Sequence, residues 1–512
     1  MELSSRGGDP GNARGGGRGR CRRHAGARLA RARARARASL SFLALALAGL
    51  LACSAGAHVA AVADTSPGGA TVGPASFVEP PGPIRHVILV TVDGLMPEAY
   101  LHPDAHGLRV PTLRRMVVEG AFSEGARSVL PSVTYPAHAS IATGVSPSRH
   151  GIYSNYAEDP QETNLDGWRW YAEDLQATPL WDLAGRARYQ TALINWPVTV
   201  GAQATWLLPE YWRAKNSEDL KLLRALSTRG LFERVGRANA RFAGRLTLAG
   251  ERDESLADVA SFVLSTGRPH LLMLHIADVD GAQHVHGLWS RPAVAAIEKA
   301  DLLLGRLIDV VVASGVWDST ALVVASDHGF ADVTRMARPG VLLREGGLVT
   351  LDPHGQVASW RAVILSASGQ CYVYLARSDD AESAAAVTRL FRARAGQPDS
   401  GIARIHDQSE IRAAGGDPHA WLSLEAAPGT FFGPGYGGGY AEPARIAATH
   451  GYDPDRPQMM ASLLMLGPHV PAGPIAAGAR LIDIAPTIAA WLSLPMPGAE
   501  GHPLVPVAQP RP

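Results

Sequence analysis

The sequence is poor in cysteine, with three in 512 residues. Cys21 and Cys53 lie near the N-terminus, and only Cys371 lies in the body of the chain. The folded body therefore cannot depend on internal disulfides, and the absence of a Cys-x-x-Cys pair excludes the common cysteine zinc knuckles. One apolar run, residues 40–52, is only 13 residues long, which is too short to cross a bilayer comfortably.

The body of the chain also lacks an excess of basic residues. Residues 1–57 hold 11 Arg and two acids, which leaves 37 basic and 45 acidic residues in the rest of the chain. A mildly acidic body offers no broad basic surface for the nucleic-acid backbone. We therefore expect no stable nucleic-acid partner.

The N-terminal residues have the composition of a targeting segment. An Arg-rich stretch is followed by the apolar run and by Ala-Gly-Ala at 55–57, an order typical of a secretory signal peptide. We predict that residues 1–57 are a signal peptide and that the protein is exported, either to a periplasm or as a secreted protein. Leu-Leu-Ala-Cys at 50–53 also resembles a bacterial lipobox, in which Cys53 would carry a lipid anchor. Residues 58–83, rich in Ala, Gly and Pro, predict a linker.

Short apolar runs followed by acids recur along the body of the chain. The run at 84–92 precedes Asp93, the run at 271–276 precedes Asp278 and Asp280, and the run at 321–325 precedes Asp327. Runs at 191–195 and 462–466 predict further buried strands. Segments with helical periodicity lie between these runs, at 111–119, 179–188, 220–238, 293–314 and 482–492.

This alternation predicts an α/β fold: a mostly parallel central sheet with helices on both faces. We assign residues 84–497 to one catalytic domain and 498–512 to a tail. Residues 341–425 interrupt the alternation and predict a smaller α+β insert. The Gly- and aromatic-rich segment 429–440 predicts a mobile loop at the rim of the site.

A hydroxyl group lies where a loop meets a helix in the stretch 130–138. Pro136 suits the first turn of a helix, so Thr134 is expected beside free backbone N–H groups that favour an anion such as phosphate. Taken alone, Thr134 is better interpreted as a helix N-cap, because Thr is common at that position.

Acids and histidines that could bind metal ions are placed at the predicted strand ends and nearby. Asp280 and His284 are four residues apart, which puts both on one face of a helical turn. Asp327 and His328 are adjacent, and oxygen and imidazole ligands without cysteine suit zinc or manganese in a catalytic site. With Asp93 and His450 the set has six members, enough for two ions of the kind used for displacement at phosphorus.

Five segments together resemble a known family. They are VTVDG at 90–94, VTYPAHASIATGVSPSRHGIYSN at 133–155, DGAQHVHG at 280–287, SDHG at 326–329 and THGYD at 449–453. Their order and spacing resemble the alkaline phosphatase superfamily, and within it the nucleotide pyrophosphatase/phosphodiesterase (type I phosphodiesterase) family. The resemblance runs from about residue 84 to about 494 and implies an alkaline-phosphatase-like fold.

The resemblance also implies a mechanism with two divalent metal ions, taken as zinc. It implies that one ion is held by Asp280, His284 and His450, and that the other is held by Asp93, Asp327, His328 and the Thr134 oxygen. Thr134 would be the nucleophile, forming a covalent phosphothreonine intermediate. Asn155 would bind a non-bridging phosphate oxygen.

The implied substrate is a small-molecule phosphodiester or a nucleotide, cleaved at a phosphodiester or pyrophosphate bond. A phosphomonoesterase of the same superfamily and a phospholipid head-group phosphodiesterase stay open as alternatives. Residues 194–197 (INWP) contain no cation where monoesterases of the superfamily grip the extra phosphate charge, which favours diesters. Several aromatic residues could form a wall of the pocket, although ordinary core or rim positions are favoured for most of them: Trp168, Trp170, Tyr171, Trp196, Tyr211 and Trp212.

Overall fold

The computed structural model describes residues 77–157, 159, 167–211, 216–248 and 250–507. The predicted signal peptide with Cys53, most of the predicted linker and the last residues of the tail lie outside these ranges. Within them, no helix combines the length and the apolarity needed to cross a membrane.

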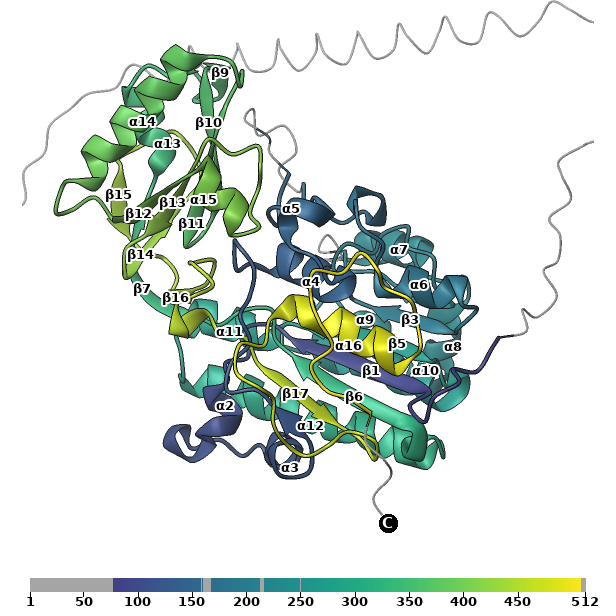
Figure 1. Cartoon of the computed structure of the whole chain (residues 1–512). Helices are drawn as coiled ribbons and strands as arrows, with labels where there is room; N and C mark the ends of the chain where they lie inside the picture. The colour runs from purple at the N-terminus through teal and green to yellow at the C-terminus, as the bar shows by residue number, and fades with distance from the viewer. Residues whose placement is uncertain (1–76, 158, 160–166, 212–215, 249, 508–512) are drawn as a thin grey trace, which may run out of the picture. The chain divides into compact units, whose positions relative to one another are not determined.

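An eight-stranded sheet forms the centre of the body (Figure 1). The four central strands run parallel in the spatial order β6, β1, β5 and β3, while β17 joins β6 in the antiparallel sense. The eight strands, in spatial order, are β18 (Gly473–Pro474), β2 (Ala121–Phe122), β17 (Leu463–Leu466), β6 (Thr320–Ala325), β1 (His86–Val92), β5 (Leu271–Ile276), β3 (Thr191–Ile194) and β4 (Trp206–Leu208). This sheet confirms the predicted α/β class.

Strand β1 shows why the sheet is covered on both faces. Val87 and Leu89 belong to one buried apolar cluster, whereas Ile88, Val90 and Val92 belong to another. Side chains of a strand alternate between the two faces, so both faces of β1 are buried under other elements. The continuous apolar run that marks this strand in the sequence follows from that double burial.

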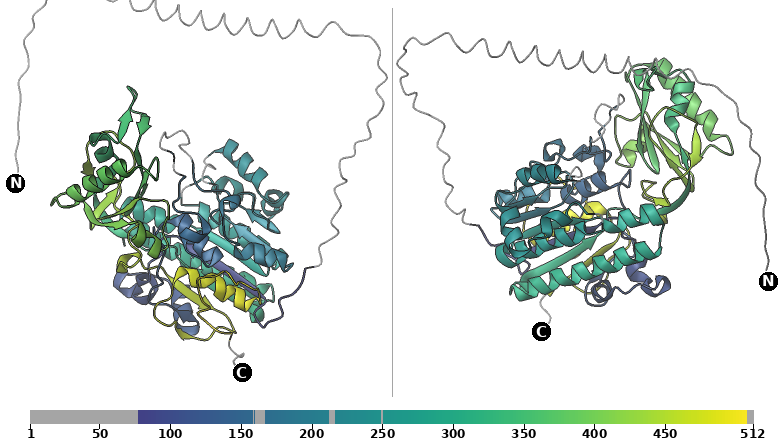
Figure 2. Two further views of the ribbon diagram at one scale, coloured as in Figure 1. Left: turned by 45° about the horizontal axis from the view of Figure 1, so that its top comes forward. Right: turned by 180° about the vertical axis from the view of Figure 1, so that it is seen from behind.

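Helices from different parts of the chain cover the two faces. In Figure 1 the yellow helix α16 lies over the near face, and the view from behind in Figure 2 shows teal helices over the other. The first face is packed by α4 (Thr134–Thr143), α6 (Leu180–Arg186) and α16 (Ile484–Trp491). The second is packed by α3 (Pro111–Glu119), α7 (Ser217–Leu226), α8 (Leu231–Ala238), α9 (Phe242–Arg245), α10 (Arg252–Gly267) and α12 (Arg291–Ala313). Short helices α2 (Glu98–Leu101), α5 (Pro147–His150) and α11 (Asp278–His286) lie between strands.

One helical expectation needs correction. The segment 220–238, predicted as one helix, forms α7 and α8. Helix α7 ends at Leu226, where Ser227 adopts an extended conformation, and Gly230, with φ of +77°, lies directly before α8 in a left-handed conformation that glycine adopts without strain. Helix α10 was not anticipated, because polar Asp253 and Ser255 interrupt the apolar face that it buries.

A smaller α+β unit follows β7 (Ala331–Ala337). Its sheet is antiparallel, with the strand order β10 (Ala362–Ala367), β11 (Gln370–Leu375), β13 (Leu422–Ala426) and β12 (Ile402–Asp407). Its helices are α13 (Pro339–Glu345), α14 (Ala381–Ala395) and α15 (Gln408–Ala413). A hairpin of β8 (Val349–Leu351) and β9 (Val357–Trp360) extends from it. We call residues 339–426 the small domain.

Strand β7 links the small domain to the central sheet region. It pairs with β14 (Gly429–Phe432), β15 (Ala441–Pro443) and β16 (Ala448–Thr449). The segment 429–440, expected as a loop, therefore begins as a strand. The chain returns through β16 directly before His450, so this connection positions that residue.

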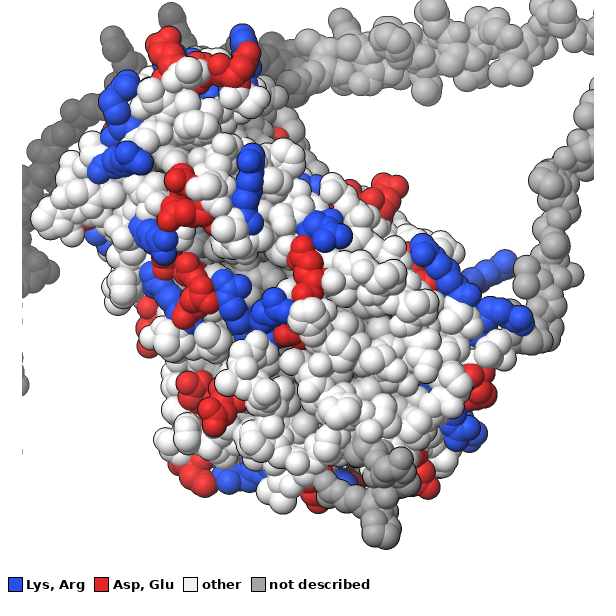
Figure 3. Space-filling view, viewed as in Figure 1, with Lys and Arg blue, Asp and Glu red and all other residues white. Residues whose placement is uncertain are grey.

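Charges of both signs share the face drawn in Figure 3. Lys and Arg lie among Asp and Glu there, and no broad patch of one sign is visible on that face. Many of the charges form ion pairs, such as Arg127 with Asp455 and Arg338 with Glu442.

Candidate active site

The predicted ligand residues meet at one edge of the central sheet. Asp93 directly follows β1, Asp327 lies two residues after the end of β6, and Asp280 lies on α11, which follows β5. These three strands are parallel neighbours, so their carboxyl ends lie side by side, where ligands bind in open α/β sheets.

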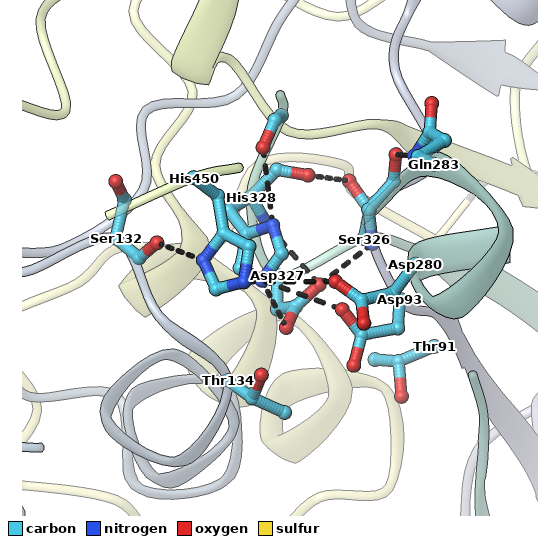
Figure 4. Close-up of polar contacts among 12 residues, drawn as sticks. Thr91, Asp93, Ser132, Thr134, Asp280, Gln283, Ser326, Asp327, His328 and His450 are labelled. Carbon is cyan, nitrogen blue, oxygen red and sulfur yellow. Dashed lines mark hydrogen bonds and ion pairs between the residues drawn. The ribbon is translucent and has the colours of Figure 1, made fainter. Parts of the chain in front are cut away.

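One group of ligands, the strand-end cluster, consists of Asp93, Asp327 and His328. The Nε2 atom of His328 lies 3.3 Å from Asp93 Oδ1 and 3.2 Å from Asp327 Oδ2. The other oxygen of Asp327 accepts hydrogen bonds from the backbone N–H groups of Gly94 and His328, each at 3.1 Å. These bonds orient the carboxylate and leave Oδ2 facing the cluster (Figure 4).

A second group, the helix-loop cluster, consists of Asp280, His284 and His450. Asp280 Oδ1 lies 3.3 Å from His284 Nε2 and 3.6 Å from His450 Nε2. Both rings point their Nδ1 atoms at backbone carbonyls, His284 at Ala448 (2.9 Å) and His450 at Ser132 (3.2 Å). Such bonds fix the orientation of each ring and direct Nε2 at the possible ion, as in metal sites generally.

The two clusters are in contact. The rings of His328 and His450 stack with centroids 3.6 Å apart and planes only 10° from parallel. Burial, and the neighbouring Asp327 carboxylate, raise the pKa of Asp93 well above its usual value. Carboxylates that repel one another in a buried place are stabilised when a cation binds between them.

Two of the three cluster histidines have lowered pKa values, whereas burial of His284 is outweighed by Asp280, which raises the pKa of His284. Burial lowers the pKa of His328 to about 4, and burial with the nearby His328 lowers the pKa of His450 well below its usual value. Burial opposes the charged form of Asp280 too, but His284 outweighs it and holds the pKa of Asp280 below its usual range. Neutral imidazole and ionised carboxylate are the forms that bind metal ions.

The donor atoms of both clusters fit divalent ions. Four of them are buried without a hydrogen-bond partner: Asp93 Oδ1, Asp280 Oδ1, Asp327 Oδ2 and His328 Nε2. Buried polar atoms are nearly always paired, so a group of orphaned atoms that face one another marks a place for an ion. All six ligand side chains therefore fit the expectation of metal binding.

Glycines directly follow four of the six ligands, and two of them, after Asp93 and His450, have positive φ and allow close packing there. Gly94 has φ of +66°, and a Cβ atom added to it would lie 2.5 Å from the Phe330 ring. Gly451 has φ of +88°, and its Cβ would clash with the carbonyl of Ala367. Both chain turns need glycine, and both turns position the ligand that precedes them.

Thr134 lies beside the clusters as the first residue of α4 (Figure 4). The N-cap position is taken by Val133, so Thr134 does not serve as the N-cap. Asn155 accepts a hydrogen bond from the backbone N–H of Tyr135 at 2.8 Å through Oδ1, and this bond does not use its amide nitrogen. Thr134 and Asn155 thus line the same cavity at the start of a helix.

A chain of buried polar residues behind Thr134 was missed by sequence reasoning. His138 lies one turn along α4, with Nδ1 2.8 Å from the Thr134 carbonyl and Nε2 2.8 Å from Thr91 Oγ1. Thr91 Oγ1 lies 3.1 Å from His275 Nδ1, and His275 Nε2 lies 3.4 Å from Asp93 Oδ2. A histidine inside the apolar strand β5 was the available signal. The chain connects the backbone of Thr134 to a ligand of the strand-end cluster.

A third group of possible ligands lies away from the cavity. His406, Glu425 and Asp453 lie close enough to hold an ion, but Glu425 already accepts a bond from Arg456 at 2.5 Å. A guanidinium at that distance already balances the carboxylate, so the group is explained as an ion-pair network without a metal.

A cavity of about 650 Å³ opens over the two clusters. Of the aromatic residues expected in its wall, Trp168 lines it, while Trp170, Trp196 and Tyr211 are buried in the core. Tyr171 is exposed, and Trp212 lies outside the described residues. Other lining residues come from β10 of the small domain, which no sequence pattern indicated, and from the segment 429–440, which the sequence predicted at the rim of the site.

Comparisons with known proteins agree with this arrangement. A family model described as type I phosphodiesterase/nucleotide pyrophosphatase matches residues 87–453. Ectonucleotide pyrophosphatase/phosphodiesterase family member 1 of Mus musculus is 25% identical over 264 residues, 50% of this chain and 24% of that protein. Bis(5'-adenosyl)-triphosphatase enpp4 of Mus musculus is 22% identical over 251 residues, 49% of this chain and 48% of that protein. The chain thus spans at most about half the length of these relatives.

Solved structures share the fold. Human ectonucleotide pyrophosphatase/phosphodiesterase 5 superposes with a TM-score of 0.58 at 17% identity, covering 81% of this chain and 97% of that chain. An inactive threonine-to-alanine variant of the murine protein, in complex with AMP, gives a TM-score of 0.56 at 18% identity, covering 82% of this chain and all of that one. The predicted alkaline-phosphatase-like architecture is therefore confirmed.

Proposed function

The chain belongs to the type I phosphodiesterase/nucleotide pyrophosphatase family, and from this premise we propose that it hydrolyses phosphodiester or pyrophosphate bonds in small molecules. Members of this family are metal-dependent. The observation that carries the proposal is the meeting of two ligand clusters, with orphaned donor atoms, beside the hydroxyl of Thr134.

We assign one divalent ion to each cluster, and we name zinc as the metal. The strand-end cluster, with the Thr134 oxygen, would hold one ion, and the helix-loop cluster would hold the other. Bound there, such ions act as Lewis acids that activate a hydroxyl and neutralise charge on a phosphate. Imidazole and carboxylate ligands without cysteine support the choice of zinc.

Thr134 is the proposed nucleophile, and its surroundings would bind the phosphate. The first backbone N–H groups of α4 have no partners within the helix and favour an anion. The Asn155 side chain, anchored by its bond from the Tyr135 N–H, can offer its amide nitrogen to a phosphoryl oxygen. Donors held in place before the reaction stabilise the charge that develops on those oxygens.

The proposed reaction consists of two displacements at phosphorus. In the first, a bond forms from Thr134 Oγ1 to phosphorus while the bond to the leaving oxygen breaks, and the hydroxyl proton ends on the released alcohol or phosphate. In the second, a water oxygen attacks the phosphothreonine and restores the Thr134 hydroxyl. The sum is the addition of one water molecule across the ester or anhydride bond.

The charge of the cavity favours diesters over monoesters. A monoester is a dianion and needs additional cations, yet no Lys or Arg occurs among the described residues that line the cavity. Residues 194–197 contain no such cation. Strand β3 ends at Ile194, and the chain continues into a buried turn. The murine structure with AMP and the bis-adenosyl triphosphatase support nucleotides as one substrate class to test.

Export is part of the proposal. The composition of residues 1–57 supports a signal peptide, with delivery to a periplasm or outside the cell, and the lipobox-like sequence at 50–53 supports a lipid anchor at Cys53 as the alternative. Mass spectrometry of the mature protein separates the two, because an anchored form begins at a lipid-modified Cys53.

Substitution of the nucleophile tests the function. We expect Thr134→Ala to abolish hydrolysis of the nitrophenyl ester of thymidine monophosphate, while metal analysis still finds close to two ions per chain. Thr134→Ser is the matched control, because it keeps a hydroxyl and should keep part of the activity. Full activity of Thr134→Ala would exclude the proposed nucleophile, and faster hydrolysis of nitrophenyl phosphate than of the diester would exclude the preference for diesters.

A further inference from the structure

Strand β10 of the small domain and the segment 429–436 that follows this domain supply one wall of the cavity above the clusters. Ile364 and Leu365 come from β10, Phe431 comes from β14, and Tyr436 follows that strand. Tyr156 and Trp168 line the cavity from the central-sheet region, and they lie against each other with ring centroids 4.5 Å apart. The part of a substrate that extends beyond its phosphate would therefore meet apolar and aromatic surface.

Hydrogen bonds hold this wall in shape. The backbone N–H of Ile364 donates to the Tyr436 hydroxyl at 3.2 Å. Ser366 Oγ donates to the Phe432 carbonyl at 2.7 Å, and the Phe432 N–H donates to the Ser368 carbonyl at 2.7 Å. Because β10 and β14 are joined in this way, the wall exists before a substrate binds, and binding needs little ordering of these segments.

The charges of the residues that line the cavity indicate the kind of substrate as much as their apolar surface does. Among the described lining residues there is no Lys or Arg, and the acid outside the two clusters is Asp159. A second or third phosphate of a substrate would thus lose its water next to apolar groups and Asp159, and no described lining residue offers a positive side chain to receive it.

We propose that this pocket selects diesters with a single phosphate whose organic group is apolar and carries no negative charge, and that it rejects nucleoside polyphosphates. This inference rests on the proposed function and narrows its substrate. An apolar group that covers the wall gains about 25 cal/mol for each Å² removed from water. A buried charge without a partner loses far more than such a contact gains.

The experiment compares four compounds on the zinc-loaded full-length protein. Two are single-phosphate diesters with the same leaving group, nitrophenyl phosphorylcholine and the nitrophenyl ester of thymidine monophosphate. Two are polyphosphates, ATP and bis(5'-adenosyl) triphosphate. We expect kcat/KM for the better diester to exceed that for either polyphosphate by at least about 100-fold, the scale set by one unpaired buried charge.

A gain-of-function variant tests the wall directly. Leu365→Lys places a cation in the lining and should raise kcat/KM for the polyphosphates relative to the diesters by about tenfold, as expected for one new charge pair at a partly exposed site. Leu365→Gln controls for polarity without charge. Val118→Lys, at a position of α3 that is 76% exposed, controls for net charge. Melting curves show that each variant is folded.

The possible outcomes distinguish a failure of this inference from a failure of the proposed function. Polyphosphates cleaved as efficiently as the diesters would overturn the inference and leave the proposed function standing. A folded, zinc-loaded protein that cleaves none of the four compounds would overturn both. If Leu365→Lys shifts the preference no more than Leu365→Gln or Val118→Lys does, the wall does not determine specificity and the inference is wrong. A strong diester preference that Leu365→Lys alone weakens supports it.

Discussion

The strand-end cluster and the helix-loop cluster use similar ligands but differ in how the fold holds them. Asp93, Asp327 and His328 are all buried, whereas Asp280 and His284 keep 20% and 24% of their side-chain surface exposed. The first set follows strands of the central sheet. The second combines a nine-residue helix with a residue from the chain that returns out of β16. The strand-end cluster is therefore held within the buried core, while the helix-loop cluster depends on more peripheral elements.

The largest expected loss of activity comes from a substitution in the buried strand-end cluster. Asp327→Asn removes the charge of a ligand whose Oδ1 already receives two backbone N–H groups. We expect activity to fall to the level of Thr134→Ala and one ion per chain to be lost, as measured by diester hydrolysis and metal analysis. Asp280→Asn is the matched variant at the other cluster and should also lose one ion. Retention of both ions in Asp327→Asn would show that the strand-end cluster does not hold a metal.

Asn155 separates phosphate binding from metal binding. Asn155→Ala removes the amide that we assign to a phosphoryl oxygen but touches neither cluster, so kcat should fall by about 10²–10³-fold. Metal content should stay at two ions per chain, in contrast to the ligand variants. Asn155→Asp, which repels a phosphate at nearly the same size, should be no better than Asn155→Ala. Loss of an ion in Asn155→Ala would contradict this division of roles.

Substitution of His275 tests whether this buried neighbour of Asp93 increases the affinity of the strand-end cluster for a metal ion. Its Nε2 atom lies 3.4 Å from Asp93 Oδ2, and its Nδ1 atom faces Thr91. His275→Phe should weaken the binding of one ion by about 10–100-fold, the usual cost of losing such a supporting partner. Titration with a competing zinc chelator measures this directly. His275→Gln should recover part of the affinity, and equal affinity in all three proteins would refute the supporting role.

The difference in side-chain exposure between the two clusters should also determine which ion dissociates first. We expect a dilute chelator to remove one ion quickly, from the helix-loop cluster, and the other slowly, from the buried set. Metal analysis at successive times should therefore give two phases. In His284→Asn the fast phase should shrink or disappear, whereas a single phase for the unchanged protein would contradict the contrast between the clusters.

Four of the proposed ligands, Asp93, Asp280, His284 and Asp327, could be placed together from the sequence because each lies beside a local signal, whereas His450 lies in a loop without periodicity. Asp93 and Asp327 end apolar runs, and Asp280 and His284 have the spacing of one helical face. Parallel neighbouring strands then bring their ends together, so local patterns were sufficient for the catalytic edge of the sheet. The α/β class followed from the same runs.

The rest of the site depends on contacts between distant parts of the chain. Leu365 reaches the cavity only because the small domain packs as it does, and the sequence around it looks like that of an ordinary strand. The place of Thr134 inside α4 rather than at its N-cap depends on where the backbone turns, which residue types do not determine to within one position. The link from His138 through Thr91 to His275 joins three elements, so no single segment indicated it.

The position of His450 in the chain affects the order in which the site is completed during synthesis of the protein. Five of the six ligands precede the small domain or its entry strand in the chain, and the sixth follows the small domain's last strand. A ribosome makes the chain from the N-terminus, so the earlier ligands are available long before His450 is synthesised. The helix-loop cluster lacks its third member until His450 has been synthesised, so an ion that needs all three side chains can bind there only after the small domain has been made.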